Sequence, residues 1–324
     1  MHFRHKSASK LDIKLIEMLI AAEATAAQKT PLLAGSDALD MRVERFGLLQ
    51  ASDPDEPLAQ LRARFAADGY LYLKRLLDPI KVNAFRGWVF ENLSSSNLLL
   101  AGSDPVAGYG NTLICDKPIA DRRLMSIVRS ARYENFCSQP DLTAFIEPFI
   151  GGMSYLHKRK LIRLTMPDTD VATPAHYDLV YLRGGTSNIV TAWIPVGDIS
   201  MAEGGLVYLK GSHAIGAQME KEFGAKSSGL SPEERINAYN SHMTEGGWVS
   251  KNLPAMAEKF DTQWLAADYQ AGDVMLHSPF MIHASTNNMS PNGRIRLSTD
   301  IRFQNVDDEI DARWSNHWSL DDML

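Results

Sequence analysis

The feature that most constrains this fold is a series of short β-type segments after Gly152. Each segment is short and has β character, and turn residues such as Gly-Gly, Pro-Asp and Pro-Asn-Gly separate them. The segments span residues 160–166, 189–196, 206–210, 273–277, 281–284 and 295–303. Many short strands joined by Gly/Pro turns are typical of a β-sandwich or jelly roll.

Helical patterns precede these segments. They cover residues 58–67, a stretch that starts at Asp78-Pro79, and residues 118–150, which end at a Gly-Gly stop. We therefore predict a mainly β fold with flanking α-helices, a double-stranded β-helix (jelly roll, cupin-like).

The domain prediction follows from this order. Residues 1–55 are expected to be an N-terminal helix and a connecting segment, and residues 56–324 a single domain. Within it, residues 56–152 form a helical support, and the jelly-roll core covers about 153–305. An insertion at about 215–260, helical around 232–242, resembles a lid or binding loop.

Composition excludes several classes of protein. The net charge of -6 is spread along the chain, so we expect neither nucleic acid nor an anionic membrane as partner. Two cysteines without metal-type spacing suit a reducing compartment. Charges interrupt the apolar run at 11–27, so it predicts an amphipathic helix rather than a signal peptide. No segment has the roughly 20 apolar residues of a membrane span. We expect a cytoplasmic protein, and its oligomeric state cannot be read from the sequence.

One pair of residues suggests metal chemistry. In an extended strand, His176 and Asp178 point to the same face and can reach one ion. A His-x-Asp pair also arises by chance, and a surface His and Asp is then the simpler interpretation. His283, at the end of another apolar segment, is the best third ligand. The set would be a two-histidine, one-carboxylate triad, which suits iron(II) and leaves coordination positions open.

The remaining histidines have simpler explanations. We expect packed or hydrogen-bonded roles for His157 and His277, and a turn-stabilising role for His213. Arg294 follows His283 by eleven positions, just past a turn. A guanidinium group there offers a permanently charged fork for the far carboxylate of a dicarboxylate co-substrate.

The stretch from Thr173 to Arg302 resembles the phytanoyl-CoA dioxygenase family of iron(II)/2-oxoglutarate oxygenases, and with the opening segment the resemblance covers roughly residues 60–305. The matching elements, in order, are Ala67-Asp68-Gly69-Tyr70-Leu71, His176-Tyr177-Asp178, Thr191-Ala192-Trp193-Ile194-Pro195-Val196-Gly197-Asp198, Glu203-Gly204-Gly205-Leu206, Lys210-Gly211-Ser212-His213, Ala271-Gly272-Asp273, His283-Ala284-Ser285, Asn287-Asn288 and Arg294.

The resemblance implies roles for the matching residues. His176, Asp178 and His283 become the iron ligands, and Arg294 the residue that binds the distal carboxylate of 2-oxoglutarate. Trp193 and Ser285 match positions close to this co-substrate. Related halogenases have a small residue in place of the carboxylate, so Asp178 implies hydroxylation or a related oxidation.

Several further residues have more than one candidate role. Arg296 lies on the same strand face as Arg294, and only the family spacing favours Arg294. Lys160 and Arg163 either contact co-substrate or substrate, or have plain surface roles. The candidate substrate residues flank the His-x-Asp motif: Tyr177, Tyr181 and Arg183.

The function predicted is an Fe(II)/2-oxoglutarate-dependent dioxygenase that oxidises a small organic molecule with O2, most simply by hydroxylation, and converts 2-oxoglutarate to succinate. One alternative is a cupin-type metal enzyme that does not use 2-oxoglutarate. Another is a non-catalytic binding protein on the same fold. The substrate itself cannot be read from the sequence.

Overall fold

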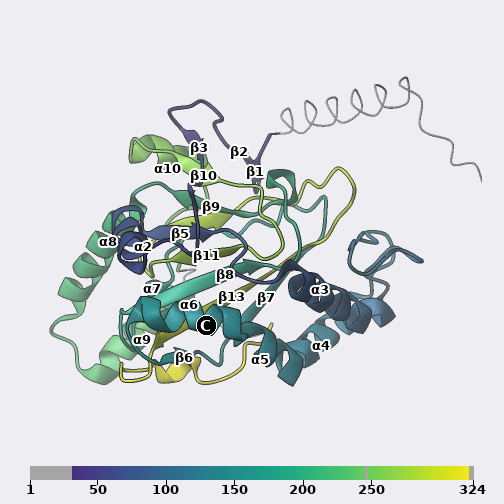
Figure 1. The fold of residues 1–324 in the computed structure, drawn as a ribbon. Helices are drawn as coiled ribbons and strands as arrows, with labels where there is room; N and C mark the ends of the chain where they lie inside the picture. Colours follow the sequence, from purple (N-terminus) through teal and green to yellow (C-terminus); the bar gives the residue numbers. More distant parts are fainter. Residues whose placement is uncertain (1–30, 245–246, 321–324) are drawn as a thin grey trace, which may run out of the picture.

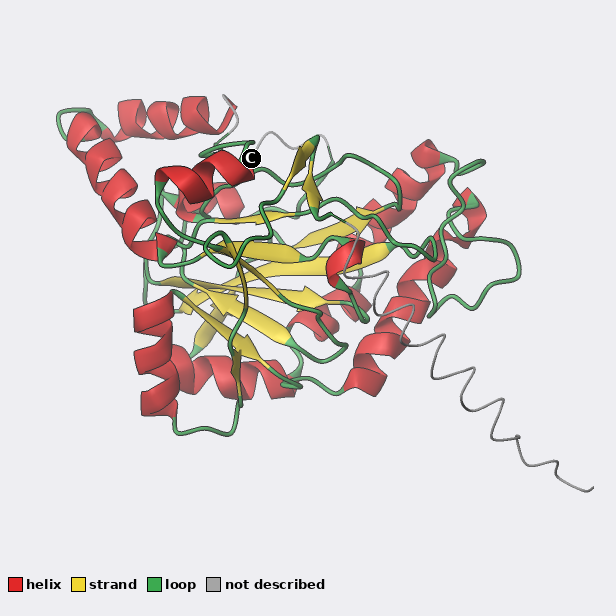
Figure 2. Ribbon diagram, turned by 90° about the horizontal axis from the view of Figure 1, so that it is seen from above, coloured by secondary structure: helices red, strands yellow, loops and turns green. Residues whose placement is uncertain are grey.

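Two facing β-sheets form the centre of the protein, and helices surround them (Figures 1 and 2). The structure is a computed structural model that describes residues 31–244 and 247–320. The minor sheet has the strand order β12-β9-β10-β3. The major sheet has the order β4-β5-β11-β8-β13-β6, and β7 also pairs with β13. This is the jelly-roll architecture that the strand pattern predicts.

The strands of the minor sheet are β3 (Phe46–Leu48), β9 (Leu206–Leu209), β10 (Trp264–Ala266) and β12 (His283–Ser285). The strands of the major sheet are β4 (Ala51–Ser52), β5 (Tyr70–Leu73), β6 (Ser154–Leu156), β7 (Leu161–Thr165), β8 (Ile189–Pro195), β11 (Val274–His277) and β13 (Arg296–Asn305). A small hairpin joins β1 (Leu33–Ala34) and β2 (Asp37–Ala38).

Helices pack on the outer face of the major sheet. They are α2 (Leu58–Asp68), α3 (Pro79–Leu93), α4 (Lys117–Val128), α5 (Ala131–Cys137) and α6 (Pro140–Ile150). Helix α3 begins where the sequence predicts, because the Asp78 side chain accepts a hydrogen bond from the Ile80 amide and Pro79 follows. Helix α6 ends at Gly151, whose φ of 80° suits glycine.

The alternation of β13 decides which side chains reach the interior between the sheets. Leu297, Ile301 and Phe303 belong to the core beneath the helices. The residues between them point the other way, so Ser298 and Arg302 line a cavity between the sheets. The helices thus cover the apolar face of β13, and its inner face carries polar side chains.

Two segments differ from the sequence prediction. Residues 31–55 are more than a connection, because β3 pairs with β10 and β4 with β5, both in parallel. The insertion begins earlier than expected, with α8 (Ser212–Ser227), and continues through α9 (Pro232–Thr244) and α10 (Leu253–Lys259). His213 lies in the first turn of α8 and packs against Gly69. The helix predicted near the N-terminus lies outside the described residues.

The remaining short elements are η1 (Ser94–Ser96), α7 (Leu179–Leu182), η2 (Met201–Glu203) and η3 (Ala312–Trp314). Within residues 31–244 and 247–320, we find no helix that is both long and apolar enough to cross a lipid bilayer.

Candidate metal centre

The structure brings His176, Asp178 and His283 together between the two sheets. The backbones of the two histidines form an antiparallel bridge, with N–H···O distances of 3.0 and 2.9 Å. Oδ1 of Asp178 lies 3.8 Å from Nε2 of His176 and 3.9 Å from Nε2 of His283. All three side chains are buried, and one ligand atom from each lies within 4.8 Å of the others.

Asp178 reaches this point by a different route from the one that strand alternation predicts. Its φ of -66° and ψ of -30° are helical, and it is the residue before α7. His176 is bridged to β12 and Asp178 opens a helical turn, so the chain bends between the two residues. The convergence is therefore produced by a strand-to-helix junction.

Hydrogen bonds orient both imidazole rings. Nδ1 of His176 donates to the Pro174 carbonyl at 2.8 Å, and Nδ1 of His283 donates to the Met281 carbonyl at 2.9 Å. A carbonyl oxygen can only accept, so each Nδ1 carries the proton and each Nε2 keeps a free lone pair. Both lone-pair nitrogens lie beside Oδ1 of Asp178, which is the arrangement that a metal ion requires.

The protonation states also suit a cation. Burial lowers the pKa of His176 and lowers that of His283 well below its ordinary value, so both rings are neutral at pH 7. Burial alone would raise the pKa of Asp178. The Arg302 guanidinium, the hydrogen bond from His277 and the neighbouring imidazoles outweigh it and hold that pKa well below its usual range. The set is two neutral nitrogens and one carboxylate.

Three side chains hold the carboxylate of Asp178 in place. Nη2 of Arg302 donates to Oδ1 at 3.0 Å, while Nε2 of His277, at 3.3 Å, and the Thr191 hydroxyl donate to Oδ2. His277 has the hydrogen-bonded role that we expect, and its Nδ1 accepts from the Tyr208 hydroxyl at 3.0 Å. Sequence reasoning missed Thr191 and Arg302, although both lie in the predicted strands 189–196 and 295–303.

A narrow cavity, here called the triad cavity, opens beside the three residues. Trp193 and Ser285 both line it, in keeping with the co-substrate positions that the family resemblance implies. Its lining consists of Arg163, Thr173, His176, Trp193, Leu206, His283, Ser285, Arg296, Ser298, Asp300 and Arg302.

The structure places Arg296, and not Arg294, in the triad cavity. Arg296 is 5% exposed, and its Nη2 donates to the Thr165 hydroxyl at 2.8 Å. Its Nε has no hydrogen-bond partner among the described residues, and none of their carboxylates lies within ion-pair distance. Burial lowers the pKa of Arg296 to about 10, so it remains a cation at pH 7.

Arg294 points elsewhere. Its side chain is 25% exposed; Nη1 lies 3.3 Å from Oε1 of Glu203, and Nε donates to the Ala107 carbonyl at 3.2 Å. It is therefore already paired with a carboxylate outside the triad cavity. The sequence leaves the roles of Arg163 and Lys160 undecided. Arg163 lines the triad cavity. The side chain of Lys160 is buried and forms an ion pair with Glu134 at 2.7 Å.

The three candidate substrate residues do not line the triad cavity. Tyr177 and Arg183 both bond to Glu220, at 2.6 and 2.9 Å, and so fasten α7 to α8. The Arg183 guanidinium also lies 3.8 Å from the ring centre of Phe223. Tyr181 places its ring 5.8 Å from that of His176, edge to face.

Comparison with known proteins agrees with this geometry. The phytanoyl-CoA dioxygenase family matches residues 65–296. The 1-deoxypentalenic acid 11-beta-hydroxylase of Streptomyces exfoliatus is 26% identical over 242 residues, which are 73% of this chain and 77% of that protein. The same-named enzyme of Streptomyces arenae is 26% identical over 243 residues, with the same coverage of 73% and 77%.

Two solved structures share the fold. The non-heme alpha ketoglutarate dependent carbocyclase SnoK has a TM-score of 0.52 and 17% identity, over 81% of this chain and 89% of that one. The epimerase SnoN, in complex with Fe3+, alpha ketoglutarate and nogalamycin RO, has a TM-score of 0.50 and 19% identity, over 78% and 85%. The jelly-roll prediction is confirmed. The match over residues 65–296 shows that this chain belongs to the phytanoyl-CoA dioxygenase family.

Proposed function

We propose that this protein is an Fe(II)/2-oxoglutarate-dependent dioxygenase that hydroxylates a small organic molecule and converts 2-oxoglutarate to succinate. One observation carries the proposal. A buried two-histidine, one-carboxylate set shares a cavity with Arg296, a buried cation that has no carboxylate partner among the described residues.

The residues fit iron(II). His176 and His283 would bind it through Nε2, and Asp178 through Oδ1, which lies beside both nitrogens. Three ligands on one side leave the other positions open for co-substrate and O2. When bound, the iron supplies the oxidising chemistry, in which O2 converts 2-oxoglutarate to succinate and carbon dioxide and turns a C–H bond of the substrate into C–OH.

Arg296 is the residue we propose for the distal carboxylate of 2-oxoglutarate. A buried guanidinium with no carboxylate of the described residues within ion-pair distance favours an anion, and its fork suits a carboxylate. Trp193 and Ser285 line the same cavity and would contact the bound dicarboxylate. Arg294, which the family spacing favours, is engaged by Glu203 instead.

The chain itself contributes geometry and exclusion of water. Burial of the triad keeps solvent from the reacting atoms, and the donors on Asp178 fix which oxygen faces the imidazoles. Asp178 would serve as the carboxylate ligand of the iron, and the family resemblance implies hydroxylation or a related oxidation where this carboxylate is intact. The relatives from Streptomyces are named as hydroxylases, which supports the same reaction type.

Release of labelled carbon dioxide from 1-labelled 2-oxoglutarate tests the proposal. The wild type should form succinate only when iron(II) and O2 are both present. Asp178→Ala should lose at least about 100-fold of this activity, since a ligand is gone. Asp198→Ala, which changes a carboxylate that accepts from the Ala271 amide, is the matched control and should retain it. Iron binding without any succinate would favour the cupin-type alternative.

A further inference from the structure

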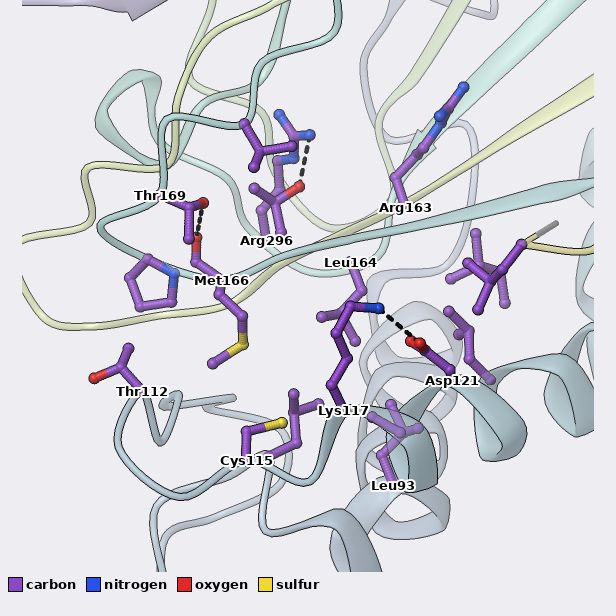
Figure 3. A pocket seen from close by; sticks show the side chains of 18 of the residues that line it. Leu93, Thr112, Cys115, Lys117, Asp121, Arg163, Leu164, Met166, Thr169 and Arg296 are labelled. Carbon is purple, nitrogen blue, oxygen red and sulfur yellow. Dashed lines mark hydrogen bonds and ion pairs between the residues drawn. The ribbon is translucent and has the colours of Figure 1, made fainter. Parts of the chain in front are cut away.

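A second and larger cavity, shown in Figure 3, shares lining residues with the triad cavity. This side cavity has a volume of about 660 Å³, within the roughly 300–1,000 Å³ typical of small-molecule sites. Arg163, Thr173 and Arg296 line both cavities. A molecule in the side cavity therefore lies next to Arg296, the residue that we assign to 2-oxoglutarate.

The side cavity wraps around strand β7. Among the described strands β7 pairs with β13 alone, so its other edge is open to the cavity. Ile162 and Leu164 line the cavity from the helix-facing side of the strand, and Arg163 and Thr165 from its inner side. The cavity thus connects the outer layer of helices with the interior of the jelly roll.

Most of the side chains around the side cavity are apolar. They come from four separate parts of the chain: the end of helix α3, helix α4 with its preceding loop, strand β7 with the residues after it, and the segment near residue 318. Representative lining residues are Leu98, Leu124, Ile162, Leu164, Met166 and Trp318. Apolar walls from several elements favour an apolar ligand by removing its surface from water.

Five charged residues line the side cavity, and Asp168 among them is exposed. Lys117 and Asp121 pair with each other at 2.6 Å, and their side chains are 77% and 36% exposed, so they form an outer rim (Figure 3). Arg163 donates to Asp300 at 2.9 Å and points away from the Lys117–Asp121 rim (Figure 3). Once Arg296 holds 2-oxoglutarate, the interior offers a ligand mainly apolar contacts.

The loop before α4 forms part of the wall of the side cavity. It contributes Thr112 and Cys115 to the lining. The residues between them, Leu113 and Ile114, are 91% and 66% exposed and do not line the cavity. Neighbouring positions of this loop therefore differ in whether they border the side cavity.

We propose that the side cavity binds the carbon skeleton of the substrate, and that the substrate is a compact, largely hydrocarbon molecule with no charge inside this cavity. The assignment of this molecule as substrate rests on the proposed function; the binding itself does not. Polar groups on the molecule would remain at the ends, at Arg163 or at the Lys117–Asp121 rim.

Binding of N-phenyl-1-naphthylamine, an uncharged apolar fluorophore, tests the proposal directly. The wild-type protein should bind it with enhanced fluorescence. A bicyclic alcohol such as decalin-2-ol should displace it, whereas the polyol inositol should not. Failure of the wild type to bind the fluorophore, or equal displacement by both competitors, would overturn the proposal.

Variants locate the binding. Met166→Glu should weaken fluorophore binding by about tenfold or more, because a carboxylate among apolar side chains must keep its water or be neutralised. Met166→Leu keeps the apolar lining and should bind within about twofold of the wild type. Unchanged affinity in Met166→Glu would contradict the proposal.

A second pair of variants does not depend on the folding of Met166→Glu. Thr112→Trp adds bulk in an exposed loop at the cavity and should weaken binding similarly, whereas Leu113→Trp, one residue away at a fully solvated position, should not. Equal affinity in these two variants would contradict the proposal. The succinate assay of the wild type tests the proposed function separately. Fluorophore binding without succinate formation would therefore contradict the proposed function but not the binding of an apolar molecule in the side cavity.

Discussion

Arg294 and Arg296 stand two residues apart near the start of β13, yet their surroundings differ. Arg296 is buried beside the triad, and Arg294 is paired with Glu203. We predict that Arg296→Ala raises the KM for 2-oxoglutarate by about 100-fold, since charge-assisted hydrogen bonds contribute roughly 1.5–3 kcal/mol. Arg294→Ala should change it by no more than about threefold. Succinate formation at varied 2-oxoglutarate measures both, and the opposite pattern would return the role to Arg294.

The hydroxyl of Thr191 provides a second test at this scale. It donates to Oδ2 of Asp178 and so helps to turn Oδ1 toward the imidazoles. Thr191→Val should lower iron(II) affinity by about 10–100-fold, the usual effect of removing a group that orients a ligand. Competition with a chelator under anaerobic conditions measures this. Ser298→Ala removes a buried hydroxyl that lines the triad cavity and has no hydrogen bond to Asp178, and it should change the affinity less than about twofold.

Helices α7 and α8 are joined by the ion pair of Arg183 and Glu220, whose side chains are 3% and 13% exposed. Glu220→Ala would leave the Arg183 guanidinium buried without its counter-charge. We expect it to lower the free energy of unfolding by about 3 kcal/mol. Asp141→Ala breaks the exposed pair with Lys81 and should lower it by less than about 1 kcal/mol. Urea unfolding measures both variants. Equal losses in Glu220→Ala and Asp141→Ala would contradict a stabilising role for the buried Arg183–Glu220 pair.

The connection between β6 and β7 carries His157, which is buried and bonded to Gln304 at 2.8 Å. Burial lowers the pKa of His157 to about 4. As the pH falls below about 6.5, the imidazole of His157 is therefore protonated in the unfolded chain but stays neutral in the folded protein. The contribution of neutral, buried His157 to the free energy of unfolding is complete above about pH 6.5 and is lost as the pH falls toward 4. Between pH 7 and 5, the free energy of unfolding of the wild type should fall by about 2 kcal/mol more than that of His157→Gln, as measured by urea unfolding. Equal losses would contradict the assignment.

On the scale of the whole molecule, the strong periodic segments were predictable and the short ones were not. Strands β8 and β13 are long and apolar on at least one face, so the sequence pattern indicates them clearly. Strands β3 and β4 have three and two residues, too few to show an alternation of apolar and polar side chains. They form because they pair with β10 and β5 at the edges of the two sheets.

The same limit applies to the candidate site. The triad could be predicted because its residue types are few and their motif is specific. The choice between Arg294 and Arg296 could not, because both have the same parity and only the packing of Glu203 separates them. The side cavity was equally hidden, since its lining comes from α4, β7 and the C-terminal part of the chain.

The central claim is that one buried site binds iron(II) and 2-oxoglutarate together, and an anaerobic titration tests it most directly. We predict a weak visible charge-transfer band that needs both additions, because chelation of the metal by the keto acid produces it. The band should be absent in His176→Ala and should require far more 2-oxoglutarate in Arg296→Ala. Iron binding without a band in the wild type, or an unchanged band in His176→Ala, would contradict the account.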